Sequence, residues 1–177
     1  MKKTALLVID VQNILVSEKP FAVNEIIENI KTLITASREN NIEVIYVQHC
    51  GKEGSGIEKK SIGWQIYDEI KPNPDEKVIP KNYNSSFKET DLYDYLKTQE
   101  IDELIITGMQ TEYCIDTSIK VAFEFGFKII IPEKTNTTFD NGNISAETLY
   151  NYYNYNIFNN RFGIVSSIEE TIKKIQK

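Results

Sequence analysis

Short apolar runs recur along the chain, and polar residues or segments with helical spacing separate each run from the next. The runs cover residues 5–9, 44–47, 78–79, 104–106, 127–131 and 163–165. Continuous apolar runs of this length are typical of strands that are buried on both faces, as in a parallel sheet. Because strand and helix patterns alternate through the whole length, we expect one three-layer α/β/α domain over residues 1–177.

Between these runs, apolar residues recur at the spacing of one helix face. The first stripe contains Ile26, Ile27, Ile30, Leu33 and Ile34, and Asn24 is its expected N-cap. A second helix is expected around Leu92, Tyr95 and Leu96. A third is expected to begin at Cys114 and end at Gly126, with a sheet-facing stripe of Ile115, Ile119, Ala122 and Phe123.

The last part of the chain has an unusual composition. Residues 150–160 are rich in tyrosine and asparagine, and we expect a helix end and a loop there, with a subunit interface as the alternative. Ser167 and Glu170 have the spacing of a capping box, which predicts a final helix.

Composition and charge exclude several classes of protein. Lys and Arg total 20 against 26 Asp and Glu, a net charge of -6, so nucleic acid is not an expected partner. The first apolar run ends at Asp10, too early for a signal peptide, and no run approaches the ~20 residues that cross a bilayer. Two cysteines, Cys50 and Cys114, do not make a disulfide framework. We therefore expect a cytoplasmic protein without membrane contact.

Three predicted strand ends carry functional side chains, Asp10, Lys81 and Cys114. The carboxyl ends of parallel strands share one edge of a sheet, so these groups are expected to meet there. A lysine ammonium and a helix start both lower the pKa of a thiol, and a carboxylate can accept its proton. Each residue alone has an ordinary explanation, as a turn cap, a surface lysine and a small buried side chain. Together they indicate a nucleophilic cysteine.

Three blocks in register resemble the isochorismatase-like cysteine hydrolases of the nicotinamidase/isochorismatase superfamily. The blocks are Asp10-Val11-Gln12, then Lys81 with Tyr83 and Ser85-Ser86-Phe87, then residues 108–114 with Thr117 and Ala122. The resemblance spans nearly the whole chain and implies a Rossmann-like α/β/α fold with a six-stranded, mainly parallel sheet. It also implies Asp10 as general acid/base, Lys81 as the cation that polarises the site, and Cys114 as the nucleophile.

The same resemblance implies a cis peptide between Met109 and Gln110, and an oxyanion hole made by the backbone N–H groups of Gln110 and Cys114. The expected activity is hydrolysis of a small amide through a thioester acyl-enzyme. Two alternatives stay open. One is hydrolysis of a vinyl ether, as in true isochorismatases, and the other is an inactive homologue that binds a small molecule or acts as a scaffold.

Nicotinamidases of this superfamily bind a metal through an aspartate and several histidines, whereas this chain has one histidine, His49. We therefore expect no catalytic metal and no cofactor. A small-molecule substrate is the expected ligand, and exposed apolar residues together with the resemblance predict a homodimer or larger homo-oligomer. The expected substrate-binding residues, each of which also has an ordinary structural explanation, are Gln12, His49, Trp64, Tyr83, Phe87 and Glu112.

Overall fold

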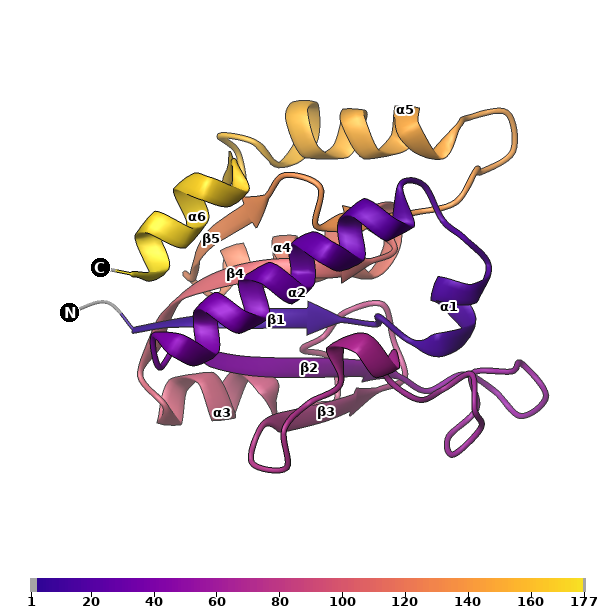
Figure 1. Ribbon diagram of the computed structural model, residues 1–177, viewed down its shortest axis with the longest axis horizontal. Coiled ribbons are helices and arrows are strands. Elements are labelled where there is room, and N and C mark those ends of the chain that lie inside the picture. Colours follow the sequence, from indigo (N-terminus) through magenta and orange to yellow (C-terminus); the bar gives the residue numbers. More distant parts are fainter. Residues whose placement is uncertain (1–2, 177) are drawn as a thin grey trace.

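The computed structural model describes residues 3–176, and its centre is a parallel sheet with helices on both faces (Figure 1). The strands lie in the order β3-β2-β1-β4-β5-β7, and a short β6 pairs with β4. Their bounds are β1 Lys3–Ile9, β2 Glu43–His49, β3 Lys77–Lys81, β4 Ile101–Met109, β5 Lys128–Pro132, β6 Asn136–Thr137 and β7 Ile164–Ser166. The α/β/α architecture is confirmed. β6 adds a seventh strand to the expected six, and its two polar residues form no apolar run that could have predicted it.

Within residues 3–176, six α-helices and three further helical segments lie between or after the strands. The α-helices are α1 Asn13–Ser17, α2 Val23–Glu39, α3 Leu92–Thr98, α4 Asp116–Glu124, α5 Ala146–Asn151 and α6 Ile168–Ile175. The 3-10 turn η1 covers Asp68–Ile70, and the π-helical segments η2 and η3 cover Thr111–Ile115 and Tyr152–Phe158. In Figure 1, α2 lies across one face of the sheet beside α6, while α3 and α4 lie on the other face.

Alternating side chains of the central strand build two separate cores. Leu6 and Val8 of β1 pack with α2 and α6, whereas Leu7 and Ile9 pack with α3 and α4. All four side chains are at most 1% exposed, so burial on both faces explains why the run lacks polar alternation. Burial of this continuous apolar surface is the main term that stabilises the sheet.

Several predicted helix boundaries are confirmed and others are corrected. Gly126 follows the end of α4 with a φ of 85°, and Ser167 with Glu170 forms the capping box of α6. The expected N-cap Asn24 is wrong, because α2 already begins at Val23, whose N–H donates to the Pro20 carbonyl. Phe123 is 43% exposed because its ring lies at the edge of the buried stripe, against Phe162.

The two π-helical segments also differ from expectation. The helical turn around Cys114 begins at Thr111 rather than at Cys114 itself. The tyrosine- and asparagine-rich segment continues α5 as η3 instead of forming a loop, because Asn154 and Phe158, four residues apart, are both buried against the core. The alternative of a subunit interface there stays a prediction.

Four neighbouring strands bring their carboxyl ends to one edge of the sheet. β1, β2, β3 and β4 end at Ile9, His49, Lys81 and Met109. Gly108 lies opposite Ile9 in the sheet with a φ of 121°, and a Cβ there would come within 1.9 Å of the Ile9 carbonyl oxygen. Only glycine permits this close approach, which sets β4 directly against the residue that precedes Asp10.

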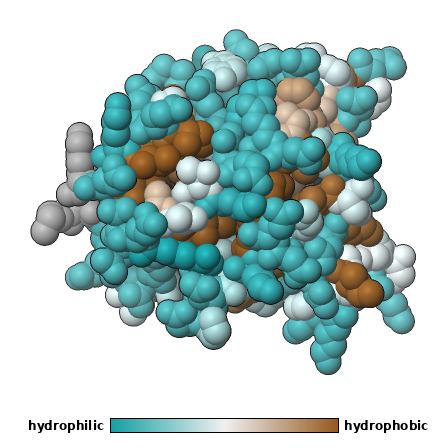
Figure 2. Space-filling model, viewed as in Figure 1, coloured by the Kyte–Doolittle hydropathy of each residue, from teal (hydrophilic) through white to brown (hydrophobic). Residues whose placement is uncertain are grey.

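Among residues 3–176, the structure contains no helix with both the length and the apolar character needed to cross a bilayer. The face shown in Figure 2 is mostly hydrophilic, and its hydrophobic residues gather in small patches separated by polar ones. Large exposed aromatic side chains do occur, including Phe125 and Tyr152, at 46% and 54% exposure. The expected homo-oligomer stays a prediction.

Candidate active site

Lys81 holds Asp10 and Cys114 together at the carboxyl edge of the sheet. The Lys81 Nζ lies 2.6 Å from Asp10 Oδ2 and 3.2 Å from Cys114 Sγ. Asp10 and Lys81 are each 1% exposed, and Cys114 is 9% exposed. The three side chains that the sequence placed at separate strand ends therefore meet in one cluster.

The neighbours of Lys81 stabilise its protonated, positively charged form. Burial lowers the pKa of Lys81, but the negative charge of Asp10, with a further contribution from Cys114, raises this pKa above its ordinary value. A lysine ammonium has three N–H donors, and here they face Asp10, the Tyr83 carbonyl at 2.9 Å, and the pair of Cys114 and His49. Each N–H donor of the ammonium thus has a partner within the cluster.

The thiol of Cys114 behaves differently from the sequence expectation. Burial raises its pKa to about 12, and the charge of Asp10 also raises it, by more than Lys81 lowers it. The helix start contributes less than expected, because Cys114 is the fourth residue of η2. The resting side chain is therefore a thiol beside a carboxylate, and forming the thiolate requires a base. Asp10 lines the same cavity and is the carboxylate next to the thiol.

His49 is a neutral hydrogen-bond donor at this site. Its Nδ1 lies 3.2 Å from the Lys81 Nζ, and burial together with the Lys81 charge lowers the pKa of its imidazole. An ammonium can only donate, so Nδ1 must accept and the proton of the neutral ring is carried by Nε2. His49 also lines the cavity, and its contact with a substrate stays a prediction.

A cavity of about 250 Å³ opens beside Cys114. Its lining residues are Asp10, Leu15, His49, Ile57, Asn84, Met109, Gln110, Tyr113 and Cys114. Sequence reasoning did not select Leu15, Ile57, Asn84, Met109 or Tyr113. Met109 and Tyr113 belong to the block that carries Cys114, and Asn84 follows Lys81 closely, so the blocks held a signal for them. Leu15 of α1 and Ile57 of the loop after β2 had none.

Gln12 and Trp64, both expected to bind substrate, lie outside the cavity lining. Gln12 is fully buried, and its amide bonds only main-chain groups: Nε2 donates to the carbonyls of His49 and Trp64, and Oε1 accepts from the His49 N–H. Trp64 is half-buried, and its indole Nε1 is enclosed by the protein. Gln12 is therefore a positioning residue that joins the end of β2 to the Trp64 segment.

Three more expected contacts are also placed elsewhere. Phe87 is a core residue that packs on the rings of Phe125 and Phe127, at centroid distances of 5.5 and 6.3 Å. The Tyr83 hydroxyl donates to Glu89 at 3.1 Å, so Tyr83 serves the cluster only through its carbonyl oxygen. Glu112 is half-buried in η2 and does not line the cavity.

Buried polar side chains link the turn that carries Cys114 to the helical segment η3 by hydrogen bonds. Thr111, at the start of η2, donates through Oγ1 to Asn136 Oδ1 at 2.8 Å. Asn136 in turn exchanges side-chain hydrogen bonds with Asn154 of η3. The peptide between Met109 and Gln110 is cis, as the resemblance implied.

A family model described as the isochorismatase domain matches residues 4–170. The chain belongs to the isochorismatase family. Among its relatives, the uncharacterized isochorismatase family protein YrdC of Bacillus subtilis is 36% identical over 129 residues, which cover 71% of this chain and 69% of YrdC. The ureidoacrylate amidohydrolase RutB of Yersinia enterocolitica is 28% identical and aligns over 94% of this chain and 86% of its own.

Further comparisons agree with this assignment to the isochorismatase family. A crystal structure of an isochorismatase family protein superposes with a TM-score of 0.87 at 30% identity, covering 94% of this chain and 99% of the other. A streptothricin hydrolase of Streptomyces noursei is 28% identical over 77% of this chain, which spans only 50% of that protein's length. The isochorismatase family thus includes hydrolases, and amidohydrolases among them.

Lys81 takes the place that a metal would need in this isochorismatase-family site. The ligand atoms of Asp10, His49 and Cys114 lie within 4.8 Å of one another, a spacing that suits a metal ion. The Lys81 Nζ, however, contacts one atom of each, at 2.6, 3.2 and 3.2 Å. Because a positively charged ammonium already contacts all three residues, and like charges repel, these residues do not fit a metal cation while Lys81 stays in place.

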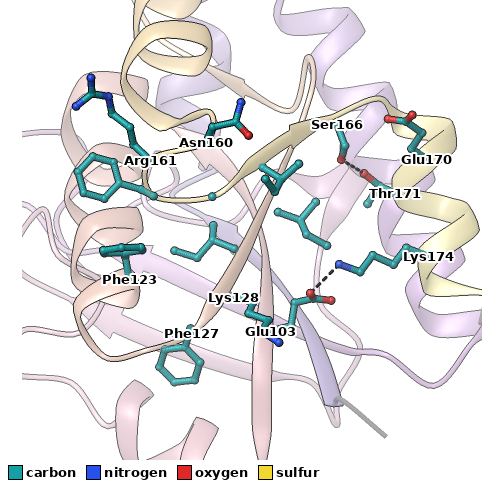
Figure 3. Close-up of a pocket in the computed structure, with 15 residues that line it drawn as sticks. Glu103, Phe123, Phe127, Lys128, Asn160, Arg161, Ser166, Glu170, Thr171 and Lys174 are labelled. Atoms are coloured by element: carbon teal, nitrogen blue, oxygen red, sulfur yellow. Dashed lines mark hydrogen bonds and ion pairs between the residues drawn. The ribbon is translucent and has the colours of Figure 1, made fainter.

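The groove in Figure 3 is larger than this cavity and lies away from it. It runs between α4, β5, β7 and α6 and has a volume of about 600 Å³. Its polar groups are largely paired, with Lys174 bonded to Glu103 at 2.7 Å and Ser166 to Thr171 at 2.9 Å. None of its lining residues belongs to the Asp10, Lys81 and Cys114 cluster, so its size does not make it the reactive site.

Proposed function

We propose that this isochorismatase-family protein hydrolyses a small amide, with Cys114 as nucleophile, Asp10 as general acid/base and Lys81 as the cation that fixes both. The observation that carries the proposal is the bridge formed by the Lys81 Nζ, 2.6 Å from Asp10 and 3.2 Å from Cys114, at the wall of a cavity. The likeness to an enzyme named as an amidohydrolase supports the amide over other acyl compounds.

The first half-reaction forms an acyl-enzyme. Asp10 accepts the proton of the Cys114 thiol as the sulfur attacks the amide carbonyl carbon, so the thiolate need not exist before substrate binds. The carbonyl oxygen becomes an oxyanion, held by the backbone N–H groups of Gln110 and Cys114. Asp10 then gives its proton to the nitrogen, the C–N bond breaks, and the amine leaves a thioester on Cys114.

The second half-reaction returns the enzyme to its starting state. Asp10 accepts a proton from water as the water oxygen attacks the thioester carbonyl carbon. The C–S bond breaks, the acid leaves, and the proton on Asp10 returns to the sulfur. Lys81 stays protonated throughout, because its raised pKa keeps it a fixed positive charge beside both groups.

The proposal is tested by incubating the protein with a panel of small amides and measuring ammonia release. The mass of the intact protein is measured by mass spectrometry during turnover. We expect a covalent adduct of acyl mass on Cys114, and loss of both adduct and turnover in Cys114→Ala. Cys50→Ala, which replaces the half-buried second cysteine, is the matched control and should retain turnover. Full turnover of an amide by Cys114→Ala would exclude the thioester route, and absence of turnover on every amide would favour vinyl ether hydrolysis or a binding or scaffold protein.

A further inference from the structure

The wall of the cavity beside Cys114 divides into a polar end and an apolar side. The polar end is formed by Asp10, His49, Asn84, Gln110 and Cys114. The apolar side is formed by Leu15, Ile57 and Tyr113, whose hydroxyl accepts a hydrogen bond from Asn141 Nδ2 at 2.9 Å. Met109 also borders the cavity, but it is fully buried and packs in the core on the α2 side of the sheet. A substrate that presents its reacting carbonyl to Cys114 must therefore place the rest of its acyl group against hydrocarbon.

The cavity offers a ligand no positive charge. Of the described residues that line it, none is an arginine or lysine, and Asp10 is the one carboxylate. Lys81 stands behind the wall, and its N–H groups are committed to Asp10, Cys114, His49 and the Tyr83 carbonyl. The lysines of the neighbouring loop, Lys52, Lys59 and Lys60, are exposed and lie outside the lining.

An anionic acyl group would be poorly accommodated here. A carboxylate that enters a low-dielectric cavity loses hydration, and only a nearby cation or several donors compensate for that loss. The volume of about 250 Å³ lies below the ~300–1,000 Å³ of sites for drug-sized ligands, which favours a small substrate.

We infer that the site takes small amides with an uncharged, apolar acyl group and rejects those whose acyl group carries a carboxylate. This inference names the substrate class and rests on the proposed function above. It separates this chain from a relative named for ureidoacrylate, because an acrylate is itself a carboxylate.

The charge preference of the cavity can be measured without turnover, by alkylating Cys114 with iodoacetamide and with iodoacetate. In both reactions the sulfur attacks the CH₂ carbon and iodide leaves, so the reagents differ in charge and little in size. At about pH 9, we expect the ratio of rate constants, amide over carboxylate, to be at least about tenfold larger at Cys114 than for glutathione. An equal ratio, or no alkylation of Cys114 by either reagent, would overturn the inference.

A designed cation provides the matched test. Ile57→Lys adds a positive charge to the apolar side and should reduce the Cys114 ratio toward that of glutathione, whereas Ile57→Gln adds polarity alone and should leave the ratio in place. Ile57 is half-buried on a loop, so either variant leaves the sheet intact. A ratio that Ile57→Lys does not change would show that the apolar side is not what excludes the carboxylate.

Two amides then separate this inference from the proposed function. Isocaproamide and succinamate have the same shape, with an isopropyl group in one where the other carries a carboxylate. We expect ammonia release from isocaproamide to exceed that from succinamate at least about tenfold in kcat/KM. Equal ammonia release from both amides would overturn the inference and leave the amidohydrolase proposal standing. If neither amide releases ammonia but Cys114 shows the expected alkylation ratio, the result would count against the hydrolase proposal and not against the charge preference.

Discussion

The side chains of Asn136 and Asn154 hydrogen-bond to each other twice, at 2.8 and 3.0 Å, and neither residue is exposed to solvent. Asn136 is in β6 and Asn154 in η3, so the pair joins the edge of the sheet to the tyrosine- and asparagine-rich helix. Asn136 Oδ1 also accepts from Thr111, three residues before Cys114. One asparagine of this helix thus helps to position the turn that carries the proposed nucleophile.

Asn154→Leu should destabilise the protein and slow the reaction. The change leaves the Asn136 amide without its partner in a buried position, which costs about 1–3 kcal/mol in the free energy of unfolding. Because Asn154 acts through Thr111 and not on the substrate, we expect kcat to fall more than KM rises. Urea unfolding and steady-state kinetics measure the two effects. Asn156→Leu, at an exposed position of the same helix, is the control, and equal losses in both variants would contradict the role of the pair.

Asp10→Asn should speed up the alkylation of Cys114 and slow down the turnover of amides. Burial is the first cause of the raised thiol pKa and the Asp10 charge the second, while Lys81 lowers it. Removing the carboxylate therefore lowers the pKa of Cys114 below about 12, and iodoacetamide should alkylate the variant faster than the wild type. Amide turnover should fall by about 100-fold or more, because the general base is gone.

The comparison for Asp10→Asn is Asp102→Asn, which removes an exposed carboxylate at the opposite end of the sheet. That variant should leave both alkylation and turnover unchanged. Slower alkylation in Asp10→Asn would mean that the carboxylate activates the resting thiol, contrary to the arrangement described above.

Lys81→Met should be strongly destabilising. The ion pair of Lys81 with Asp10 has side-chain exposures of 0% and 2%, and removing one partner of a buried pair costs about 3–5 kcal/mol. The double variant with Asp10→Asn should recover part of this loss, because no uncompensated charge is left. Lys77→Met breaks a pair with Asp91 whose side chains are 30% and 61% exposed, and it should cost at most about 1 kcal/mol. Urea unfolding of the four proteins checks both statements.

His49 should titrate below its ordinary pKa of 6.5, because burial and the Lys81 charge disfavour the imidazolium. In the unfolded chain the ring binds a proton at a higher pH than in the folded protein, so folding stability falls as the pH drops below about 6.5 and stops falling under the folded pKa. As the chain has a single histidine, its ring nitrogens can be followed by NMR without ambiguity.

The NMR spectra should show the tautomer with the proton on Nε2 at neutral pH. Lys81→Met should raise the midpoint of the titration, since it removes a positive charge 3.2 Å from Nδ1. A midpoint at or above 6.5 in the wild-type protein would contradict the contact with Lys81.

The sequence predicted the positions of some candidate site residues correctly and those of others wrongly, and particular residues show why. Asp10, Lys81 and Cys114 could be brought together because each follows an apolar run, and parallel strands end at one edge. Gln12 and Phe87 lie in the same blocks, but their side chains turn into the protein, and a block does not reveal side-chain direction. β6 and the two π-helical segments depend on contacts between distant parts of the chain, such as Asn136 with Asn154. The raised pKa of Cys114 follows from burial, which no residue pattern specifies.

Gln12 fixes both ends of the segment between β2 and Trp64 through main-chain contacts with His49 and Trp64. Apart from the tightly packed Gly51, Gly56 and Gly63, residues between those anchors, Ile57 among them, can therefore be exchanged without moving the strand ends that carry Asp10 and Lys81. One stretch of chain is free to diversify while the reacting groups keep their geometry. In evolution, or in a directed library limited to this stretch, a new substrate preference could arise in few steps on an unchanged chemical apparatus.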